Sequence, residues 1–453
     1  MSSLRRRLAS AARMAEVDTA VAFALLARVW QIISGIVTMV AVVRYLTPEA
    51  QGFFYTFNSL LGLQSFFELA FYLVIINAAS HDWAHLRLES DGSIGGEPEA
   101  LSRLVSLGRV SVKWYAVASA LFLVGVGTAG FFFFSKSPDS GVTWRGPWIA
   151  LVLCSAMVLF ALPFQSLLEG CNQVAVLQRY RLQQVILSAL ALWATLFFGL
   201  GLWAAAAAAL ATVLNSLVLI LHRYRRFFGA FLQPPSGARL DWRTDIWPMQ
   251  WRLALSGVVS FLAVSLFNPV MFHYHGAATA GRMGLTLAIS AGVQAIALAW
   301  ISTRVPRFGQ YVSRRDWRSL DALWWRSAIV STAVAIAGAL AAFLLVYVLH
   351  DLRMPVSQRL LAPLPTAILL AGAVIMHMSQ CQSAYLRAHR QEPIVWMSVT
   401  CSVLTGLSVW WFGARMGPIG AAWSYLAVAG ITIVWETAIW RRCRALWHAE
   451  NAV

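Results

Sequence analysis

Residues 20–43 of this 453-residue chain read AVAFALLARVWQIISGIVTMVAVV, and this stretch decides the fold class. It is long enough to cross the hydrocarbon core of a bilayer, which takes about 20 apolar residues in a helix. Hydrophobic residues lie on every side of such a helix, whereas a helix on the surface of a soluble protein has a polar face. The stretch therefore predicts a transmembrane helix with Arg28 as its single charge.

The same pattern recurs along the whole chain. Hydrophobic residues make up 59% and charged residues 12% of the sequence, about half of the roughly 25% charged residues of a soluble domain. We therefore expect an all-α polytopic membrane protein with about 12 transmembrane helices. The predicted spans are residues 20–43, 53–79, 107–134, 148–169, 182–199, 202–222, 251–272, 283–303, 327–349, 362–386, 394–413 and 417–440.

The positions of Lys and Arg set the orientation. With the N-terminus in the cytoplasm, 27 of the 35 Lys and Arg residues fall in cytoplasmic segments, counting Arg109, Lys113 and Arg252 at the cytoplasmic ends of their spans, 7 fall in outer loops, and Arg28 lies deeper within a span. Cytoplasmic loops of membrane proteins are enriched in Lys and Arg. The bias predicts a multi-pass protein of the bacterial inner membrane with both termini in the cytoplasm. It also explains the net charge of +16 without nucleic-acid binding.

The sequence offers no constellation for catalysis. It has no GxxxxGK[ST] loop for ATP, and its five cysteines have neither CxxC nor metal-ligand spacing. No outer loop is long enough to hold a polymerase or ligase site. We expect a transporter rather than an enzyme, with no cofactor and no metal.

The two halves of the chain resemble each other. RYLTPEAQGFFYTFNSLLGL, starting at Arg44, aligns with HYHGAATAGRMGLTLAISAGV, starting at His273, and this alignment pairs Gly52 with Gly281. Further on, LLEGCNQ aligns with YLRAHRQ, which pairs Glu169 with Arg387.

Each half contains six predicted spans, an even number, so both halves enter the membrane from the same side. This predicts two six-helix lobes, residues 1–222 and 251–453, joined by a cytoplasmic linker at 223–250. The lobes would be related by a pseudo-two-fold axis along the membrane normal, an arrangement that places a substrate path between them.

Three segments resemble the polysaccharide flippases of the multidrug/oligosaccharidyl-lipid/polysaccharide exporter superfamily. They are VVRYLTPEAQGFF after the first span, LLEGCNQ…QRY after the fourth, and GARMGPIGAAWSYLAVAG at the start of the last. The second span departs from the family, because it ends ELAFYLVIINAASHDW where the family often has dlGl. The lipid II flippases of this superfamily are less similar, since they typically have two further helices.

This resemblance implies a secondary-active, alternating-access flippase for cell-surface polysaccharide biosynthesis, with lipopolysaccharide or exopolysaccharide as the product. Its expected partners are an undecaprenyl-diphosphate-linked glycan, membrane lipids and, as a further candidate, the polysaccharide polymerase or export machinery. Two alternatives stay open. One is a drug or cation antiporter of the same superfamily. The other is a membrane glycosyltransferase or polymerase that acts on the lipid-linked glycan.

Two charged residues lie deep in predicted spans. Arg28 lies about 12 Å from the cytoplasmic end of the first span, and Glu68 about 16 Å from that end of the second, at 1.5 Å per residue. They are either a structural ion pair or a substrate site. In the substrate site Arg28 attracts the diphosphate, which a guanidinium binds two oxygens at a time, and Glu68 orients it. As a further alternative, Glu68 exchanges protons.

Other polar or helix-bending residues are candidates for binding and gating. Glu169 and Arg387 would form a salt bridge that closes the cytoplasmic mouth, or else are two solvated helix ends. His377, with Gln380 and Gln382, would hydrogen-bond sugar hydroxyls, or else His377 joins two helices. Prolines allow helices to bend during gating, and the candidates are Pro163 and Pro269.

Overall fold

The computed structural model describes residues 2–136, 141–234, 237, 247, 265–389 and 392–449, with side chains from Thr19 onward. It is almost entirely α-helical. The chain divides into two compact units, each described here by itself. Unit 1 comprises Met1–Tyr45, Leu63–Lys136 and Thr143–Gly257, and unit 2 comprises Leu46–Gly62, Ser137–Val142 and Val258–Val453.

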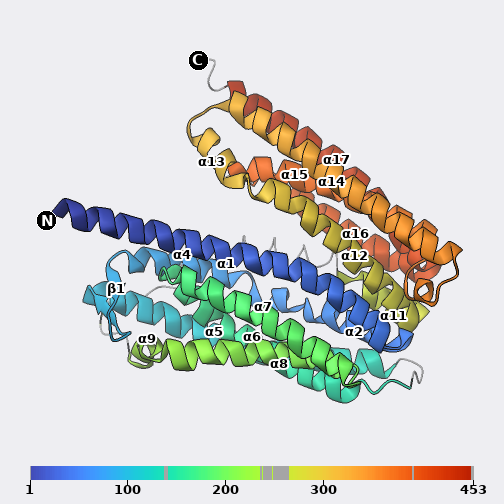
Figure 1. Ribbon diagram of the computed structural model, residues 1–453, viewed down its shortest axis with the longest axis horizontal. Coiled ribbons are helices and arrows are strands. Elements are labelled where there is room, and N and C mark those ends of the chain that lie inside the picture. The colour runs from blue at the N-terminus through green and yellow to red at the C-terminus, as the bar shows by residue number, and fades with distance from the viewer. Residues whose placement is uncertain are drawn as a thin grey trace. The chain divides into compact units, whose positions relative to one another are not determined.

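Unit 1 contains long helices and a small hairpin (Figure 1). The hairpin pairs Leu86 with Gly96 and Leu88 with Ile94 in antiparallel register. The elements of unit 1 are α1 (Ser2–Tyr45), α3 (Gln64–Glu68), α4 (Phe71–Trp83), β1 (Leu86–Leu88), β2 (Ile94–Gly96), α5 (Pro98–Ser135), α6 (Arg145–Gly170), α7 (Val174–Phe197), α8 (Trp203–Leu217), the π-helical turn η1 (Val218–Arg223), α9 (Arg225–Gly229) and the 3₁₀ turn η2 (Ala230–Leu232).

Unit 2 contains the remaining described helices. One of them, α2, comes from the N-terminal half of the chain, and the others follow the second half in order. They are α2 (Pro48–Leu61), α11 (Phe267–His275), α12 (Ala277–Ser302), α13 (Val305–Ser313), α14 (Trp317–Asp351), the 3₁₀ turn η4 (Pro355–Arg359), α15 (Pro363–Ala388), α16 (Val395–Met416) and α17 (Pro418–Ala449).

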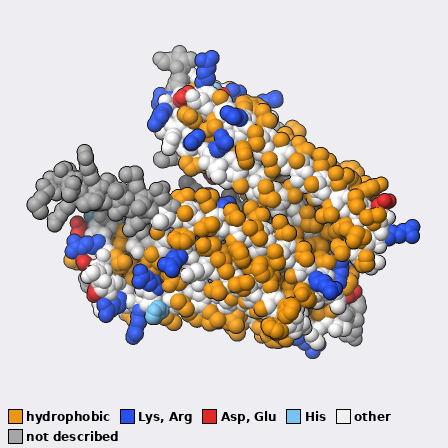
Figure 2. All heavy atoms as spheres, in the orientation of Figure 1, with side chains coloured by type: hydrophobic (Ala, Val, Ile, Leu, Met, Phe, Trp, Pro, Cys, Tyr) orange, Lys and Arg blue, Asp and Glu red, His pale blue; other side chains and the backbone are white. Residues whose placement is uncertain are grey.

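Each of the twelve predicted spans has a helical counterpart, except that residues 251–264 lie outside the described part of the chain. By length and apolar composition, eight helical stretches among the described residues can cross a membrane, with α16 and α17 counted as one, and a bent pair makes a ninth. Figure 2 shows hydrophobic side chains over the lengths of the helices and Lys and Arg at their ends. The prediction of an all-α multi-pass membrane protein is confirmed.

The second predicted span, 53–79, is not one helix. The chain forms α2, α3 and α4 there, and the axis bends by 46° between the end of α3 at Glu68 and the start of α4 at Phe71. The hairpin β1–β2 was also not predicted, because its residues lie in the acidic, Gly-containing connection 80–106, which has no apolar alternation.

The same helix pairs pack together in both halves of the chain. In unit 1 the fourth span, α6, packs on α5, α4 and α8, and α7 packs on α1 and α8. In unit 2 the fourth span of the repeat, α15, packs on α14, α12 and α17, and α16 packs on α11 and α17. Each pair in one half thus has its counterpart in the other, as a sequence repeat requires.

Helix α2 packs on α12 of unit 2 with almost no space between their backbones. A Cβ atom at Gly52 would lie 1.8 Å from the carbonyl oxygen of Ala277, and one at Gly281 would lie 2.9 Å from the amide nitrogen of Gly52. The buried Gln51 side chain donates from Nε2 to the carbonyl oxygen of Gly281, at 2.8 Å. The two glycines that the repeat aligns therefore lie against each other.

This packing groups Leu46–Gly62 with the second half of the chain, whereas the predicted first lobe, 1–222, included it. Half of the predicted linker, 223–250, lies outside the described residues. The division into lobes 1–222 and 251–453 stays a prediction.

The close contact at Gly52 has a testable consequence for stability. Gly52→Ala forces a methyl group into the backbone of α12, and overpacking of this kind costs about 1–3 kcal/mol or more. We expect a markedly lower melting temperature in detergent, followed by tryptophan fluorescence. The matched control is Gly292→Ala in α12, where an added Cβ has no neighbour within 4 Å. Equal melting temperatures for the two variants would contradict the contact.

Candidate functional site

Arg28 lies on α1, in a 27-residue apolar segment, Thr19–Tyr45. The side of α1 that packs on α7 is marked by Trp30, whose indole nitrogen donates to the carbonyl oxygen of Val185 at 3.2 Å. Arg28 is two residues from Trp30, so it lies on another side of the helix, and it is exposed. Among the described residues Arg28 has no ion-pair partner, and no ion pair joins it to Glu68.

Glu68 is the last residue of α3 and lies at the bend of the second span. Leu69 and Ala70 follow it with φ of 50° and 52°, both in the left-handed region. This conformation costs an L-residue about 1–2 kcal/mol, and such strained residues recur at functional sites. Glu68 itself is half-buried. The bend thus places a carboxyl group beside a break in the backbone of a transmembrane segment.

Two predicted site residues, Glu68 and Glu169, lie in the same region of unit 1. Tyr72, the second residue of α4, lies within electrostatic reach of Glu68, Glu169 and Arg181. Arg181 on α7 donates from Nη2 to Oε2 of Glu169 at 2.6 Å, in a partly buried ion pair. The region therefore holds two carboxylates, one guanidinium and one phenol, and Glu169 and Arg181 are in direct contact.

The four predicted gating residues have the following local contacts. Glu169 pairs with Arg181 in unit 1, and Arg387 pairs with Glu392 in unit 2, at 3.4 Å with both side chains exposed. Helix α6 continues through Pro163. Pro269 is the third residue of α11, in the first helical turn, where proline is tolerated. Their roles in gating stay predictions.

His377 is fully buried on α15 of unit 2. Its Nε2 lies 2.9 Å from Oγ of Ser331 on α14, and Ser331 Oγ donates to the carbonyl oxygen of Ala297 on α12. This is the helix–helix hydrogen bond that the sequence left open as the alternative for His377. Gln380 has a buried Oε1 without a hydrogen-bond partner among the described residues. Binding of sugar by His377 and Gln380 stays a prediction.

A buried carboxylate in unit 2 was not predicted as a site residue. Glu436 on α17 is fully buried. It accepts hydrogen bonds from the hydroxyls of Ser379 and Ser383, which lie one turn apart on α15. Next to them, Gln382 Nε2 donates to Oγ1 of Thr437 at 2.9 Å. The i, i+4 spacing of the two serines, which the sequence analysis did not use, is the sequence signal for a polar partner on the facing helix.

At one end of unit 2, Asp321 joins three helices. Arg444 on α17 donates from Nη2 to Oδ2 of Asp321 on α14 at 2.5 Å, and Tyr385 on α15 donates to Oδ1 at 2.9 Å. His389, the C-cap of α15, stacks on Trp447 with ring centroids 3.8 Å apart. Among the residues that the structure describes, no group of three or more His, Cys, Asp or Glu residues is placed to hold a metal ion.

The strained residues beside Glu68 can be tested by substitution. Ala70→Gly relieves the left-handed strain at Ala70 but adds unfolded-state freedom, so we expect stability unchanged or raised by up to about 1 kcal/mol. The matched control is Ala78→Gly within α4, which should lower it by about 1 kcal/mol. Thermal melts in detergent measure both. Destabilisation of the two variants by the same amount would contradict the left-handed conformation of Ala70.

The stability of unit 2 should depend on pH through His389. Burial lowers the pKa of His389 below its usual value of 6.5, against the opposing effects of the Tyr385 carbonyl and Asp321, and nearby His448 lowers the pKa further. The unfolded chain then binds more protons than the folded one, so stability is full above about pH 6.5 and falls as pH drops through the folded pKa. We expect His389→Phe to flatten the fall in melting temperature between pH 7.5 and 5.5, and His350→Phe, at an exposed position on α14, to leave it unchanged.

No protein-family model matches this sequence, and no curated protein matches it. The fold has clear relatives among solved structures. An inward-facing multidrug resistance MATE family transporter of the MOP superfamily has 14% identity and a TM-score of 0.59, over 93% of this chain and 99% of that one. The MATE multidrug transporter DinF-BH in complex with R6G has 12% identity and a TM-score of 0.56, over 95% and 96%.

The lipid II flippase MurJ, in an inward closed conformation, has 11% identity and a TM-score of 0.62, over 92% of this chain and 86% of that one. Identities of this size establish the fold and nothing finer. The chain is a multi-pass membrane protein with the fold that the MATE transporters and MurJ share.

Proposed function

We propose that the chain is a secondary-active flippase that moves an isoprenoid-diphosphate-linked oligosaccharide from the cytoplasmic to the outer leaflet of the bacterial inner membrane. The product would supply cell-surface polysaccharide biosynthesis. The fold supports a transporter, because the solved structures that share it are named as drug transporters and a lipid II flippase. The observation that carries the choice of an anionic substrate is Arg28.

An exposed guanidinium in a transmembrane helix needs a partner. A charged side chain within a span is costly and normally faces a bundle interior or a wet cavity, where it pairs with an opposite charge. Arg28 has no such partner among the described residues. A diphosphate supplies oxygens in the spacing that a guanidinium binds in pairs. Transport of a lipid-linked diphosphate gives this charge its counter-ion.

A drug or cation antiporter would depend on accessible carboxylates. Among the described in-span carboxylates, Glu169 is paired with Arg181 and Glu436 is buried between two serine hydroxyls. Glu68 is half-buried at the bend. The antiporter alternative therefore rests on Glu68, and it predicts that Glu68→Gln abolishes export of a cation such as R6G.

In the proposed cycle, lobes 1–222 and 251–453 rock about the linker 223–250 and alternate access to the substrate. Arg28 binds the diphosphate end, Glu68 sets the orientation, and His377 and Gln380 bind sugar hydroxyls. The partners are the undecaprenyl-diphosphate-linked glycan, membrane lipids and the polysaccharide polymerase or export machinery, with both termini in the cytoplasm. The gate and its hinges are Glu169, Arg387, Pro163 and Pro269. The chain is a transporter in this proposal and performs no chemistry on the glycan.

The test is the leaflet distribution of lipid-linked glycan in cells with and without the protein, read with an impermeant probe. We expect deletion to trap finished glycan on the cytoplasmic side and wild type to release it. Arg28→Ala loses a charge-assisted contact worth about 1.5–3 kcal/mol, so flipping should fall by about tenfold or more. Arg44→Ala, at an exposed position on the same helix, is the matched control and should flip normally.

The remaining outcomes separate the alternatives. Unfinished glycan on the cytoplasmic side would identify an enzyme, as would finished glycan that is already outside but unattached. Normal glycan export together with R6G export that depends on Glu68 would identify a drug antiporter. Either result would refute the flippase.

A further inference from the structure

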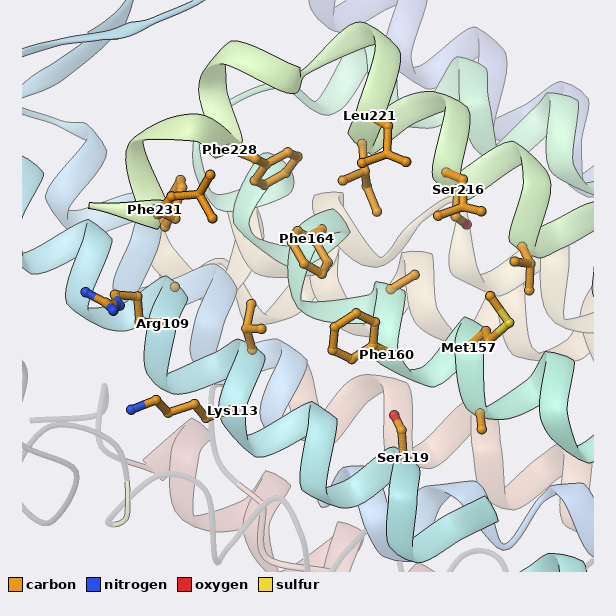
Figure 3. A pocket seen from close by; sticks show the side chains of 18 of the residues that line it. Arg109, Lys113, Ser119, Met157, Phe160, Phe164, Ser216, Leu221, Phe228 and Phe231 are labelled. Atoms are coloured by element: carbon orange, nitrogen blue, oxygen red, sulfur yellow. The ribbon is translucent and has the colours of Figure 1, made fainter. Parts of the chain in front are cut away.

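Unit 1 contains an elongated apolar cavity between α5, α6 and α8. Its volume is about 740 Å³, within the range of small-molecule sites. Figure 3 shows Phe160 and Phe164 of α6 and Leu221 of η1 around it. Several lining residues are exposed, among them Met157 and Leu221. In a membrane protein such a cavity opens to hydrocarbon, so an apolar chain can occupy it.

One end of the cavity is cationic. Arg109 and Lys113 project from successive turns of α5 at the end away from Met157 (Figure 3), and Arg225 of α9 also lines the cavity. Arg109 donates from Nη1 to the carbonyl oxygen of Gln233 at 3.3 Å. Among the described residues no Asp or Glu lines the cavity, and Arg109, Lys113 and Arg225 form no ion pair. This end therefore suits a phosphate group.

A buried hydroxyl deeper in the cavity lacks a partner. Ser119 of α5 is 7% exposed, and its Oγ has no hydrogen-bond partner among the described residues. Figure 3 shows the hydroxyl directed into the cavity. Ser119 lies six residues beyond Lys113, about 9 Å deeper at 1.5 Å per residue. A buried polar group without a partner is costly, so the cavity calls for a ligand with an acceptor below its phosphate.

We propose that this cavity binds one anionic glycerophospholipid of the membrane, a use separate from transport of the glycan. The phosphate lies between Arg109, Lys113 and Arg225, an acyl chain lies along Phe160 and Phe164, and an ester carbonyl accepts from Ser119. Basic pockets between transmembrane helices bind anionic head groups in this way. A polyprenyl diphosphate satisfies the cations and the apolar wall but has no acceptor below its diphosphate for Ser119. The ester carbonyl therefore favours the glycerophospholipid.

The first experiment measures lipid binding and its place. The purified full chain is incubated with phosphatidylglycerol that carries a photoreactive group on one acyl chain, in vesicles of otherwise zwitterionic phosphatidylcholine. We expect saturable labelling of one lipid per chain, on peptides of α5, α6 or η1. Unlabelled phosphatidylglycerol should compete and phosphatidylcholine should not. Equal competition by phosphatidylcholine, or labelling spread over the helices, would overturn the site.

Charge and shape variants test which residues hold the lipid. Lys113→Gln with Arg109→Gln should weaken phosphatidylglycerol binding about tenfold or more. The matched control, Arg179→Gln with Arg223→Gln, removes the same charge from exposed positions outside the cavity and should bind normally. Ala120→Trp should fill the cavity and abolish labelling there. If this variant fails to fold, the charge variants still decide, and equal affinity of the two double variants would overturn the proposal.

The proposed hydrogen bond from Ser119 to an ester carbonyl distinguishes a bound phospholipid from a bound isoprenoid. Ser119→Ala should weaken diester phosphatidylglycerol about two- to tenfold and leave the diether analogue unchanged. Equal loss for both lipids, or no loss, would refute the contact. Undecaprenyl phosphate is the competing probe. If it displaces phosphatidylglycerol at lower concentration than phosphatidylglycerol displaces itself, the cavity binds the isoprenoid tail and the proposal is wrong. Glycan flipping is read separately, so failure of this site leaves the proposed function standing.

Discussion

The close contact between the backbones of α2 and α12 is the constraint on which much of unit 2 depends. Because Gly52 has no side chain, α2 approaches the carbonyl of Ala277, and Gln51 then reaches the carbonyls of Gly281 and Arg359. Arg359 in turn donates to the carbonyl of Leu46 at 2.7 Å. Because these groups are buried or partly buried, each backbone carbonyl that helix geometry leaves open needs a protein donor. Two adjacent residues of α2 thus fix its register on α12 and on the η4 turn.

The two halves share their helix packing but differ in the polar contacts between their helices. Five helix pairs of one half have counterparts in the other, because the same apolar pattern recurs in both halves. The polar contacts between the fourth and sixth helices differ. In the first half Gln165 donates to Ser216 at 3.2 Å, and in the second half two serines hold the carboxylate of Glu436. The repeated scaffold therefore carries different polar groups in its two halves.

The sequence predicted the features that depend on the length of the apolar segments and on the internal repeat. The spans followed from runs of about 20 apolar residues. The contact between Gly52 and Gly281, which the repeat only aligned, was not predicted. The sequence could not predict the break after Glu68, because Leu69 and Ala70 adopt left-handed backbone without the glycine or proline that usually marks one. It also missed that Arg181, twelve residues on, pairs with Glu169. Hydropathy reports which segments can cross a membrane, whereas the choice of polar partner depends on how two helices are rotated against each other.

Both proposals place an anionic lipid beside a cationic side chain in apolar surroundings. At Arg28 a cation lies well within an apolar span, and in unit 1 Arg109 and Lys113 lie at the end of an apolar cavity. A hydrophilic anion would satisfy the charge but leave the apolar walls exposed to water. A cationic drug would fill the walls but meet a charge of its own sign, which in a low-dielectric setting is strongly repulsive. An anionic lipid meets both demands, since its phosphate pairs with the cation and its chain stays in hydrocarbon.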